Sequence, residues 1–509
     1  WLKHPPLSLD LTLSKEAPIE QLNTYFDTDD WRIYRAGYAL RLRRRNDRAE
    51  FTLKSIDPRH SAYSARREVT QRLPLLDNIE VEQLDGVVGD RVQALRGKRS
   101  INPLFTEITR RQPYGLWYDS GRIGELSLDN TTFIGETFDD QSQLLRIEIE
   151  SANGEIERLQ PFVEQIRADL MLTAASASKF VTGLSIHRLE PVEPVTPASL
   201  SFDQSSSIVE VAYAILARQL TEFIRREPGT RLGDDIEELH DMRVAARRLR
   251  AALSLFSAFL PAEFDYVGEE LRWVASALGE VRDLDVQLGE ISGWISQVDE
   301  PDGIALDALL DELRRRRTAS RERMLTVLNS ERYERMTAEF TQLLSSRDES
   351  LDSSAANAIA PNLVFRRQRK FSRKADRIKP DSANEAFHAV RIDAKRLRYA
   401  LEFLSPLYGK GVTDYIRQLV AVQDLIGKHQ DAVVAIENLR NLANETTSLT
   451  GPTVFAMGRI AERYAEDARH IRVQFPEAYR ELEGKRLARL ESELRTQPNS
   501  KHAKRKRKH

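Results

Sequence analysis

The sequence of 509 residues contains no cysteine. This absence excludes disulfide bonds, thiolate nucleophiles and cysteine metal sites, and it favours a cytoplasmic protein. Long apolar runs are also missing, since no stretch approaches the roughly 18 residues that predict a membrane-spanning helix. We therefore expect no membrane partner. No signal peptide opens the chain, although Trp1 in place of methionine is compatible with trimming.

The chain also lacks an excess of positive or negative charge. The chain carries 76 basic and 78 acidic residues, for a formal net charge of −2. Its 41% hydrophobic and 30% charged residues indicate a soluble, globular protein, and its length allows two or three domains. A sum near zero says nothing about partners, because the signs can still be segregated along the chain.

Alternation of apolar and charged residues dominates the first third of the chain. It is clear in four runs, which are Tyr38–Arg43, Phe51–Lys54, Gly124–Asp129 and Leu145–Glu150. Period-two alternation is typical of strands with one apolar and one polar face. Residues 159–166 read as a helix that follows the last strand. We assign residues 1–188 to an antiparallel β domain.

The remainder of the chain has a helical pattern. Residues 189–207 are rich in proline and serine and predict a linker. Apolar residues at three- and four-residue spacing then predict an all-α domain over 208–495. A polar break divides this domain into halves of about 208–345 and 361–495, and the basic tail 496–509 is expected to be disordered. The fold class is therefore α+β, with several domains.

An internal repeat is the strongest signal in the helical region. The segment HDMRVAARRLR begins at His240, and HAVRIDAKRLR begins 148 positions later at His388. The same offset carries Asp283 onto Asp431. Apolar positions also match, because Leu249, Leu253 and Phe256 correspond to Leu397, Leu401 and Leu404.

The spacing of the repeat gives each helix a basic face. At about 100° per residue, His240, Arg243, Arg247 and Arg250 fall within an arc of roughly 80°, opposite the apolar positions. Like charges at this spacing repel one another. An anionic ligand explains such a face most simply, and phosphate oxygens suit the planar fork of arginine.

Two other interpretations of the basic faces stay open. Each could be a solvated helix face that pairs with acids of a neighbouring helix. Metal binding by His240 and His388 is the other possibility, although neither histidine has a second ligand at suitable spacing on its own helix face.

Both copies of the motif, together with Leu278–Val286, resemble the CHAD domain (conserved histidine α-helical domain). The resemblance covers residues 207–490, and it implies two four-helix bundles related by pseudo-two-fold symmetry. It also implies that inorganic polyphosphate binds in a basic central channel. The implied polyphosphate ligands are His240, Arg243, Arg247, Arg248, Arg250, Arg282, His388, Arg391, Lys395, Arg396, Arg398, Lys428 and His429. The second copy departs from the first at one position, where Gln430 replaces Arg282.

Charged residues also line up in the strand region. If its strands close into a barrel with the charged face inward, basic and acidic side chains share one interior. Basic groups could then grip phosphate while carboxylates hold Mg²⁺ or Mn²⁺. An open sheet whose charged face lies in water is the plainer alternative.

The strand region resembles the CYTH domain of triphosphate tunnel metalloenzymes. The matching segments are Tyr25–Asp30, Leu40–Arg43, Thr52–Lys54, Arg67–Glu68, Leu128–Asp129, Glu148–Glu150 and Ser178–Phe180. The resemblance implies an eight-stranded tunnel that hydrolyses triphosphate or related substrates with divalent metal. The implied triphosphate ligands are Arg41, Arg43, Lys54, Arg111 and Lys179. The implied catalytic residues are Glu68, Glu148 and Glu150, and the implied metal ligands are Glu148, Glu150 and Asp129.

One element of the CYTH pattern is not recognisable. The family opens with a strand of the form Glu-x-Glu-x-Lys, whose acids help to hold the metal. Residues 9–14 of this chain, LDLTLS, are a poor substitute. We expect that this strand either lies upstream of the sequence or has been lost. In the second case the tunnel is open or rebuilt and metal binding is weakened, which counts against hydrolysis.

Several partners are compatible with these patterns. We expect a cytoplasmic protein that binds inorganic polyphosphate, with phosphate granules as one location, and that takes triphosphate as a further ligand. Nucleic acid is an alternative because basic helices also suit a phosphodiester backbone. However, Tyr399 is the one aromatic near the repeat that could stack on a base. A scaffold that docks an acidic protein is the third hypothesis.

The basic-face hypothesis predicts a specific loss of binding. Exchange of Arg247→Glu together with Lys395→Glu should abolish polyphosphate binding, because the centre of each face changes sign. Helicity by circular dichroism and the melting temperature should stay nearly unchanged. Binding of the unaltered protein should weaken steeply with salt, because counterions are released from the polyanion. Unaltered affinity in the variant, or a flat salt response, would contradict the hypothesis.

Overall fold

The protein is described from a computed structural model. The structure describes residues 2, 11–45, 48–56, 67–73, 81–118, 120–135, 142–152, 156–192, 196–197, 200–295, 300–346, 354–446 and 449–495. Two compact units make up the chain, residues 1–194 and 195–509. The predicted basic tail and parts of the predicted linker lie outside the described residues.

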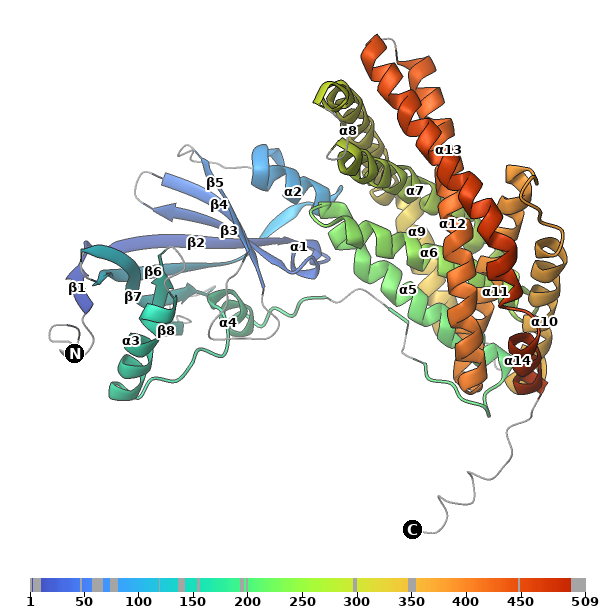
Figure 1. The fold of residues 1–509 in the computed structure, drawn as a ribbon. Coiled ribbons are helices and arrows are strands. Elements are labelled where there is room, and N and C mark those ends of the chain that lie inside the picture. Colours follow the sequence, from blue (N-terminus) through green and yellow to red (C-terminus); the bar gives the residue numbers. More distant parts are fainter. Residues whose placement is uncertain are drawn as a thin grey trace. The chain divides into compact units, whose positions relative to one another are not determined.

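The first unit is an antiparallel sheet (Figure 1). Its strands are β1 (Leu11–Lys15), β2 (Ile19–Thr28), β3 (Tyr38–Arg45), β4 (Arg48–Ser55), β5 (Glu68–Leu73), β6 (Ile101–Tyr118), β7 (Gly121–Ile134) and β8 (Ser142–Ser151). The strands follow the order β5-β4-β3-β2-β6-β7-β8, and β1 pairs with β6 beyond the end of β2. All four runs of alternating residues lie in strands, as predicted.

The first strand of the unit is present but chemically different from the family pattern. Residues Leu11–Lys15 pair with Tyr114–Tyr118 of β6. The strand therefore occupies a place in the sheet, while its sequence LTLSK supplies no acidic side chain. Among the described residues, β5 and β8 form the two edges of the sheet.

Register assigns opposite characters to the two faces of the sheet. On the outer face, Leu40, Phe51 and Leu53 are fully buried, and α2 (Gly86–Arg96) packs on this side of β4 and β5. Helix α3 (Ile156–Asp169) covers β7 and β8, which confirms the helix predicted at 159–166. The inner face is polar, because the residues that alternate with these apolar positions are charged or hydroxylated.

An aromatic cluster closes off part of the inner face. Short helix α4 (Lys179–Ile186) places Phe180 against Tyr25 of β2, with ring centroids 5.2 Å apart. Gly183 lies so near the ring of Phe105 that a Cβ would approach it to 2.2 Å. Another short helix, α1 (Arg32–Arg35), begins where Asp27 accepts the backbone N–H groups of Ile33 and Tyr34.

The second unit consists of two copies of one helical arrangement. The first copy contains α5 (Ile208–Leu232), α6 (Ile236–Phe256), α7 (Glu263–Ile295), α8 (Glu300–Leu328) and α9 (Glu331–Ser345). The second contains α10 (Ala356–Ala375), α11 (Asn384–Leu404), α12 (Lys410–Glu445), α13 (Gly451–Arg480) and α14 (Lys485–Arg495). Helices α6 and α11 begin and end 148 residues apart, as the repeat predicts.

The starts of the two copies pair with each other. Ile208 donates its backbone N–H to the carbonyl of Ser354, and Ala356 donates to the carbonyl of Ser206. These bonds join equivalent positions of the repeat reciprocally, as pseudo-two-fold symmetry requires. Ser207 and Glu210 form a capping box at the start of α5.

Two predicted details of the helical unit need correction. The second half begins at Ala356 rather than at 361, because residues 356–360 form the first turn of α10. Within the described residues, each copy also has five α-helices where four were predicted, since the fourth is followed by a short helix, α9 or α14. Helix α9 starts at a new N-cap, Ser330, whose hydroxyl accepts the N–H of Tyr333.

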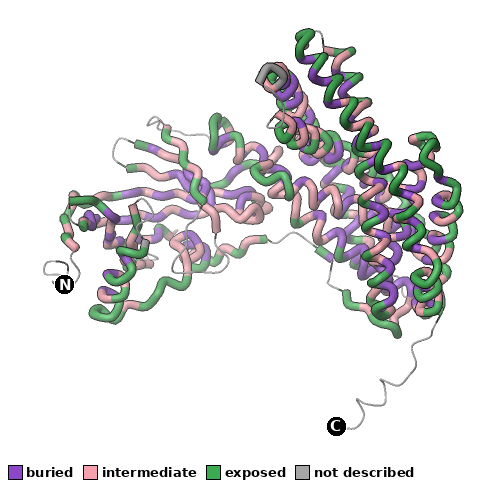
Figure 2. Tube along the Cα trace, in the orientation of Figure 1, coloured by how far each residue is buried: buried purple, intermediate pink, exposed green. Residues whose placement is uncertain are grey.

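Apolar residues of both copies form a continuous core. The predicted core positions of α6 and α11 are buried, among them Leu249 and Leu397, each 0% exposed. Buried segments follow the inward faces of the helices in Figure 2. A second apolar cluster joins the distal parts of α7, α8, α12 and α13. Among the described residues, no helix is long and apolar enough to span a membrane.

Truncation of this core should destabilise the protein measurably. Leu249→Ala should lower the free energy of unfolding by about 2–5 kcal/mol, because it leaves a cavity among fully buried side chains. Urea denaturation followed by circular dichroism measures the change. The control Val473→Ala removes a side chain that is 68% exposed on α13, and it should change stability by less than about 0.5 kcal/mol. Equal effects of the two substitutions would contradict the assigned core.

Candidate anion-binding sites

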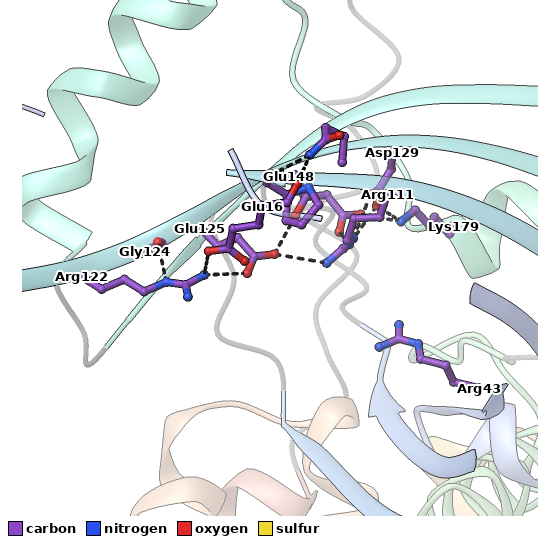
Figure 3. A network of polar contacts seen from close by, with 12 residues as sticks. Glu16, Arg43, Arg111, Arg122, Gly124, Glu125, Asp129, Glu148 and Lys179 are labelled. Carbon is purple, nitrogen blue, oxygen red and sulfur yellow. Dashed lines mark hydrogen bonds and ion pairs between the residues drawn. The ribbon is translucent and has the colours of Figure 1, made fainter. Parts of the chain in front are cut away.

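Opposite charges meet on the inner face of the sheet (Figure 3). Arg111 of β6 donates two hydrogen bonds of 2.8 Å to Asp129 of β7 and one of 2.6 Å to Glu148 of β8. Lys179, at the start of α4, contacts both carboxylates and lies 3.1 Å from Glu148. Four predicted site residues are therefore gathered by three strands and one helix. Asp129 has no exposed side-chain surface.

A second group of predicted residues lies on β3, β4 and β5. Arg41 lies 3.5 Å from Glu68, and Lys54 lies 3.1 Å from the other oxygen of that carboxylate. Arg43 donates to Asn23 over 3.0 Å and lies 3.4 Å from Glu50. The polar face is thus partly buried, since Arg41 is only 8% exposed whereas the side chain of Lys54 is 39% exposed.

Glu107 joins this interior and was missed in the sequence. It lies on β6 at 1% exposure and accepts a hydrogen bond of 3.1 Å from Asn23. Burial raises its pKa, and the nearby cations, Lys179 first, act in the opposite direction. The signal that could have revealed it is the period-two register, because Glu107 alternates with Ile108 in the same way as Arg111 alternates with Gln112.

Cations dominate the ionisation of Glu148. Burial by itself would raise its pKa, but Lys179 and Arg111 lower it to about 2. The pKa of Glu68 is also lowered. Burial by itself would raise it, but Lys54 and Arg41 lower it by more. Both carboxylates are therefore charged throughout the neutral range, and in the protein without ligand they neutralise the cations that would otherwise bind phosphate.

Whether the predicted metal ligands fit a divalent cation can be judged from these bonds. Asp129 and Glu148 already bond to Arg111 and Lys179, while Glu150 is exposed and pairs in register with Glu125. Within the described ranges, no three acidic or histidine side chains gather as a metal site. As arranged, these residues do not fit Mg²⁺ or Mn²⁺, and a metal role for them stays a prediction.

In the helical unit, cations converge between the two copies. The N-terminal halves of the basic faces of α6 and α11 bring together Arg243, Arg247, Arg391 and Lys395, which we call the central cluster. Two acids lie at its edge. Arg243 is 3.2 Å from Asp283, and the equivalent Arg391 is 3.6 Å from Asp431.

Crowding in the central cluster shifts the ionisation of its members. Burial first, and then Arg391 and Arg247, lower the pKa of Lys395 to about 7. The pKa of Arg391 is lowered by burial as well, with Asp431 opposing the shift. In the described part of the chain, no carboxylate forms an ion pair with Arg247 or Lys395. The cluster therefore holds positive charge that the protein itself does not balance.

A cavity of about 670 Å³ extends from this cluster. Its walls come from α6, the start of α7, α10 and α11. The charged residues that line it are Arg247, Arg250, Asp265, Glu269, Arg272, Arg367, Lys395 and Arg396. Six of these are basic and two are acidic, so the cavity is an anion site by charge. Arg272 and Arg367 were missed because they lie outside the repeated motif.

Other predicted ligands have protein partners. Arg248 bonds to Glu402, and Arg398 lies 3.4 Å from the same carboxylate. His388 forms a 2.8 Å hydrogen bond with Gln430, whereas the pKa of His240 is lowered by burial and by nearby Arg282. Lys428 is exposed on α12.

His429 was predicted wrongly as a phosphate ligand. Its side chain is 0% exposed and stacks on Phe387 at 4.6 Å, while Arg472 donates a 3.1 Å hydrogen bond to its Nε2. Burial and Arg472 lower its pKa to about 4, so the ring is neutral. A histidine packed in this way is part of the core of the second copy and is not accessible to a phosphate ligand.

Comparisons with known proteins agree with both units. Residues 3–183 match the CYTH domain, and residues 214–440 match the CHAD domain. Two curated proteins from Mycobacterium tuberculosis, both uncharacterized, are 30% identical to the chain over 258 residues. The match covers 49% of this chain and 49% of either relative, so the chain spans about half the length of these relatives.

Solved structures resemble each unit separately. The CHAD domain from the plant Ricinus communis is 29% identical, with a TM-score of 0.49, and covers 57% of this chain and 96% of its own. PptA from Streptomyces chartreusis is 21% identical, covers 54% and 100%, and has a TM-score of 0.45. A Hippeastrum protein, described as a candidate adenylyl cyclase with a dominant triphosphatase activity, is 20% identical, covers 34% and 84%, and has a TM-score of 0.24.

The lowered pKa of Lys395 predicts a pH-dependent affinity for anions. Below about pH 7 the side chain is charged before an anion binds, whereas above it binding must first take up a proton. The affinity for polyphosphate should therefore fall as pH rises from 6 to 8, by at most about tenfold per pH unit. Fluorescence titration of the full chain measures this fall. Lys395→Arg should remove most of it, because arginine stays charged, and an equally steep fall in that variant would contradict the assignment.

Proposed function

The chain is a two-domain protein in which a CYTH domain is followed by a CHAD domain, and we propose that it binds inorganic polyphosphate between the two copies of its helical unit. A linear polyanion suits this site because the cations come from both copies and are distributed over two helices. Triphosphate or the end of a short phosphate chain is the proposed ligand of the strand domain.

The unbalanced charge of the central cluster carries this proposal. Four cationic side chains meet at the junction of α6 and α11, and burial together with Arg391 and Arg247 lowers the pKa of one of them, Lys395, to about 7, although Asp431 opposes the shift. A bound anion would relieve this repulsion. Phosphate oxygens match the guanidinium forks of Arg243, Arg247 and Arg391.

The strand domain supports a different mode of binding. Its cations Arg111, Lys179 and Arg41 are already paired with carboxylates, so a phosphate ligand must displace those contacts. Exchange of one anion for another keeps the interior neutral. The triphosphatase activity described for the Hippeastrum protein makes triphosphate the natural ligand to test.

Competition experiments separate polyphosphate from the alternative ligands. Fluorescently labelled polyphosphate would be titrated with the full chain, and then unlabelled polyphosphate, single-stranded DNA and a poly-glutamate peptide would be added as competitors. We expect polyphosphate to compete at least about tenfold better than either other polymer. Tyr399 is 3% exposed and offers no surface for a nucleobase. Stronger competition by DNA or by the peptide would refute the proposal and favour a nucleic-acid binder or a scaffold.

Glu148→Gln tests the role of the strand domain. Loss of this carboxylate frees Arg111 and Lys179, so tripolyphosphate should bind several-fold more tightly, as measured by calorimetry. Phosphate release from tripolyphosphate with Mg²⁺ or Mn²⁺ is measured on the same samples. Release by the unaltered chain that disappears in the variant would assign hydrolysis to this domain. Weaker binding in the variant would show instead that Glu148 acts with the ligand rather than against it.

A further inference from the structure

Pseudo-symmetry gives the α6–α11 pair two equivalent flanks. On the first flank, Ala251 and Ser254 of α6 face Arg396 of α11. On the second flank, the residues 148 positions later, Tyr399 and Glu402 of α11, face Arg248 of α6. If the two flanks were alike, a phosphate chain bound at the central cluster could extend beyond it along either one.

The second flank is filled by its own side chains. Glu402 bonds to Arg248 and lies 3.4 Å from Arg398, so one carboxylate serves both cations. The ring of Tyr399 lies beneath the same two guanidinium groups, at 5.5 Å from Arg248 and 5.2 Å from Arg398. Its hydroxyl also accepts a 2.7 Å hydrogen bond from Arg247. On this flank the two cations are therefore paired with a carboxylate, and the space is filled by the side chains of Tyr399 and Glu402.

The first flank is open. Small residues, Ala251 and Ser254, stand where the second flank has Tyr399 and Glu402, and the 670 Å³ cavity lies beside them. Tyr399 also lines this cavity, so its ring stands between the open flank and the filled one. Two further arginines line it. Arg367 of α10 replaces the equivalent Gln219 of α5, and Arg272 of α7 replaces Val420 of α12.

Charge on the open flank is only partly balanced. Arg272 pairs with Glu269 at 3.0 Å and Arg396 lies 3.6 Å from Asp393, but among the described residues no carboxylate pairs with Arg250 or Arg367. Burial, followed by neighbouring cations, lowers the pKa of both Arg250 and Arg367. Both shifts reflect like charges that are held close together in a partly buried place.

We propose that the open flank holds the end of a phosphate chain, and that Tyr399 and Glu402 close the opposite flank so that the chain leaves the central cluster in one direction only. This inference rests on the proposed binding of polyphosphate and adds chain-end recognition to it. A terminal phosphate has a second ionisable oxygen with a pKa near 6, so at neutral pH it carries up to one more negative charge than an internal phosphate. A cavity lined by six cations favours that extra charge.

Chains with free and blocked ends test the proposal. The probes are short polyphosphate with free ends and the same chain with both terminal phosphates coupled to a neutral amine. Calorimetry with the full chain should give at least about tenfold tighter binding of the free-ended probe. Equal affinities would overturn chain-end recognition while leaving polyphosphate binding intact. Failure to bind either probe would refute the proposed function itself.

Variants that exchange the two flanks locate the effect. Arg367→Gln with Arg272→Val gives the open flank the residues of the second copy, and the preference for free ends should fall to about twofold or less. A preference that persists in this variant would arise elsewhere, in the strand domain for example, and would overturn the proposal. The matched control Arg314→Gln, an exposed arginine of α8 paired with Asp311, should leave the preference unchanged.

Opening the closed flank tests the other half of the proposal. Tyr399→Ala with Glu402→Ser removes the ring and the carboxylate, so a blocked chain can run across both flanks. Its affinity should rise several-fold and approach that of the free-ended chain. Circular dichroism checks that the variant is folded, and Glu402→Gln alone, which keeps the shape, should give a smaller rise in the same direction. Unchanged affinity of the blocked chain in both variants would overturn closure by Tyr399 and Glu402.

Discussion

Repulsion between like charges at the junction of α6 and α11 is the interaction on which the helical unit depends. Arg243, Arg247, Arg391 and Lys395 are held together although they repel, and the lowered pKa of Lys395 reflects its burial and then that repulsion. The apolar faces of the same two helices hold the cations in place. Leu249 and Leu397 are fully buried on the opposite side of each helix, so the hydrophobic core supplies the stability that the cluster lowers.

In the strand domain, by contrast, the cations are paired with carboxylates. Arg111 and Lys179 are neutralised by Asp129 and Glu148, and the pKa of Glu148 falls to about 2 because those cations favour its charged form. At Arg111 and Lys179 a ligand would therefore find cations that are already paired with carboxylates. Phosphate that binds in this domain must therefore replace a carboxylate at the cations. In the helical unit, by contrast, phosphate adds negative charge to a cluster whose cations are not fully paired. The two domains should respond differently to salt and to pH for this reason.

Much of the architecture was predictable because it follows from local periodicity. The alternating runs lie in strands, and the motifs at His240 and His388 lie on helices with matching ends. Local periodicity does not, however, predict which side chains contact one another across the fold. Period-two patterning in Leu145–Glu150 could not say that Arg111 would bond to Glu148, and the helical motif could not say that His429 would be buried under Arg472. Those contacts join residues that are 37 and 43 positions apart.

The sequence by itself determined which residue types share a face, because the angular spacing of side chains along a helix or strand is fixed by the backbone. It therefore established two basic helix faces, a charged sheet face and the 148-residue repeat. Only the tertiary structure decided which cations stay unbalanced, since that depends on which helix packs beside which. Arg248 and Arg396 are equivalent in the repeat, yet Arg248 pairs with Glu402 of the other copy, whereas Arg396 pairs with Asp393 of its own helix and lines an open cavity, because the residues that face them across α6 and α11 differ.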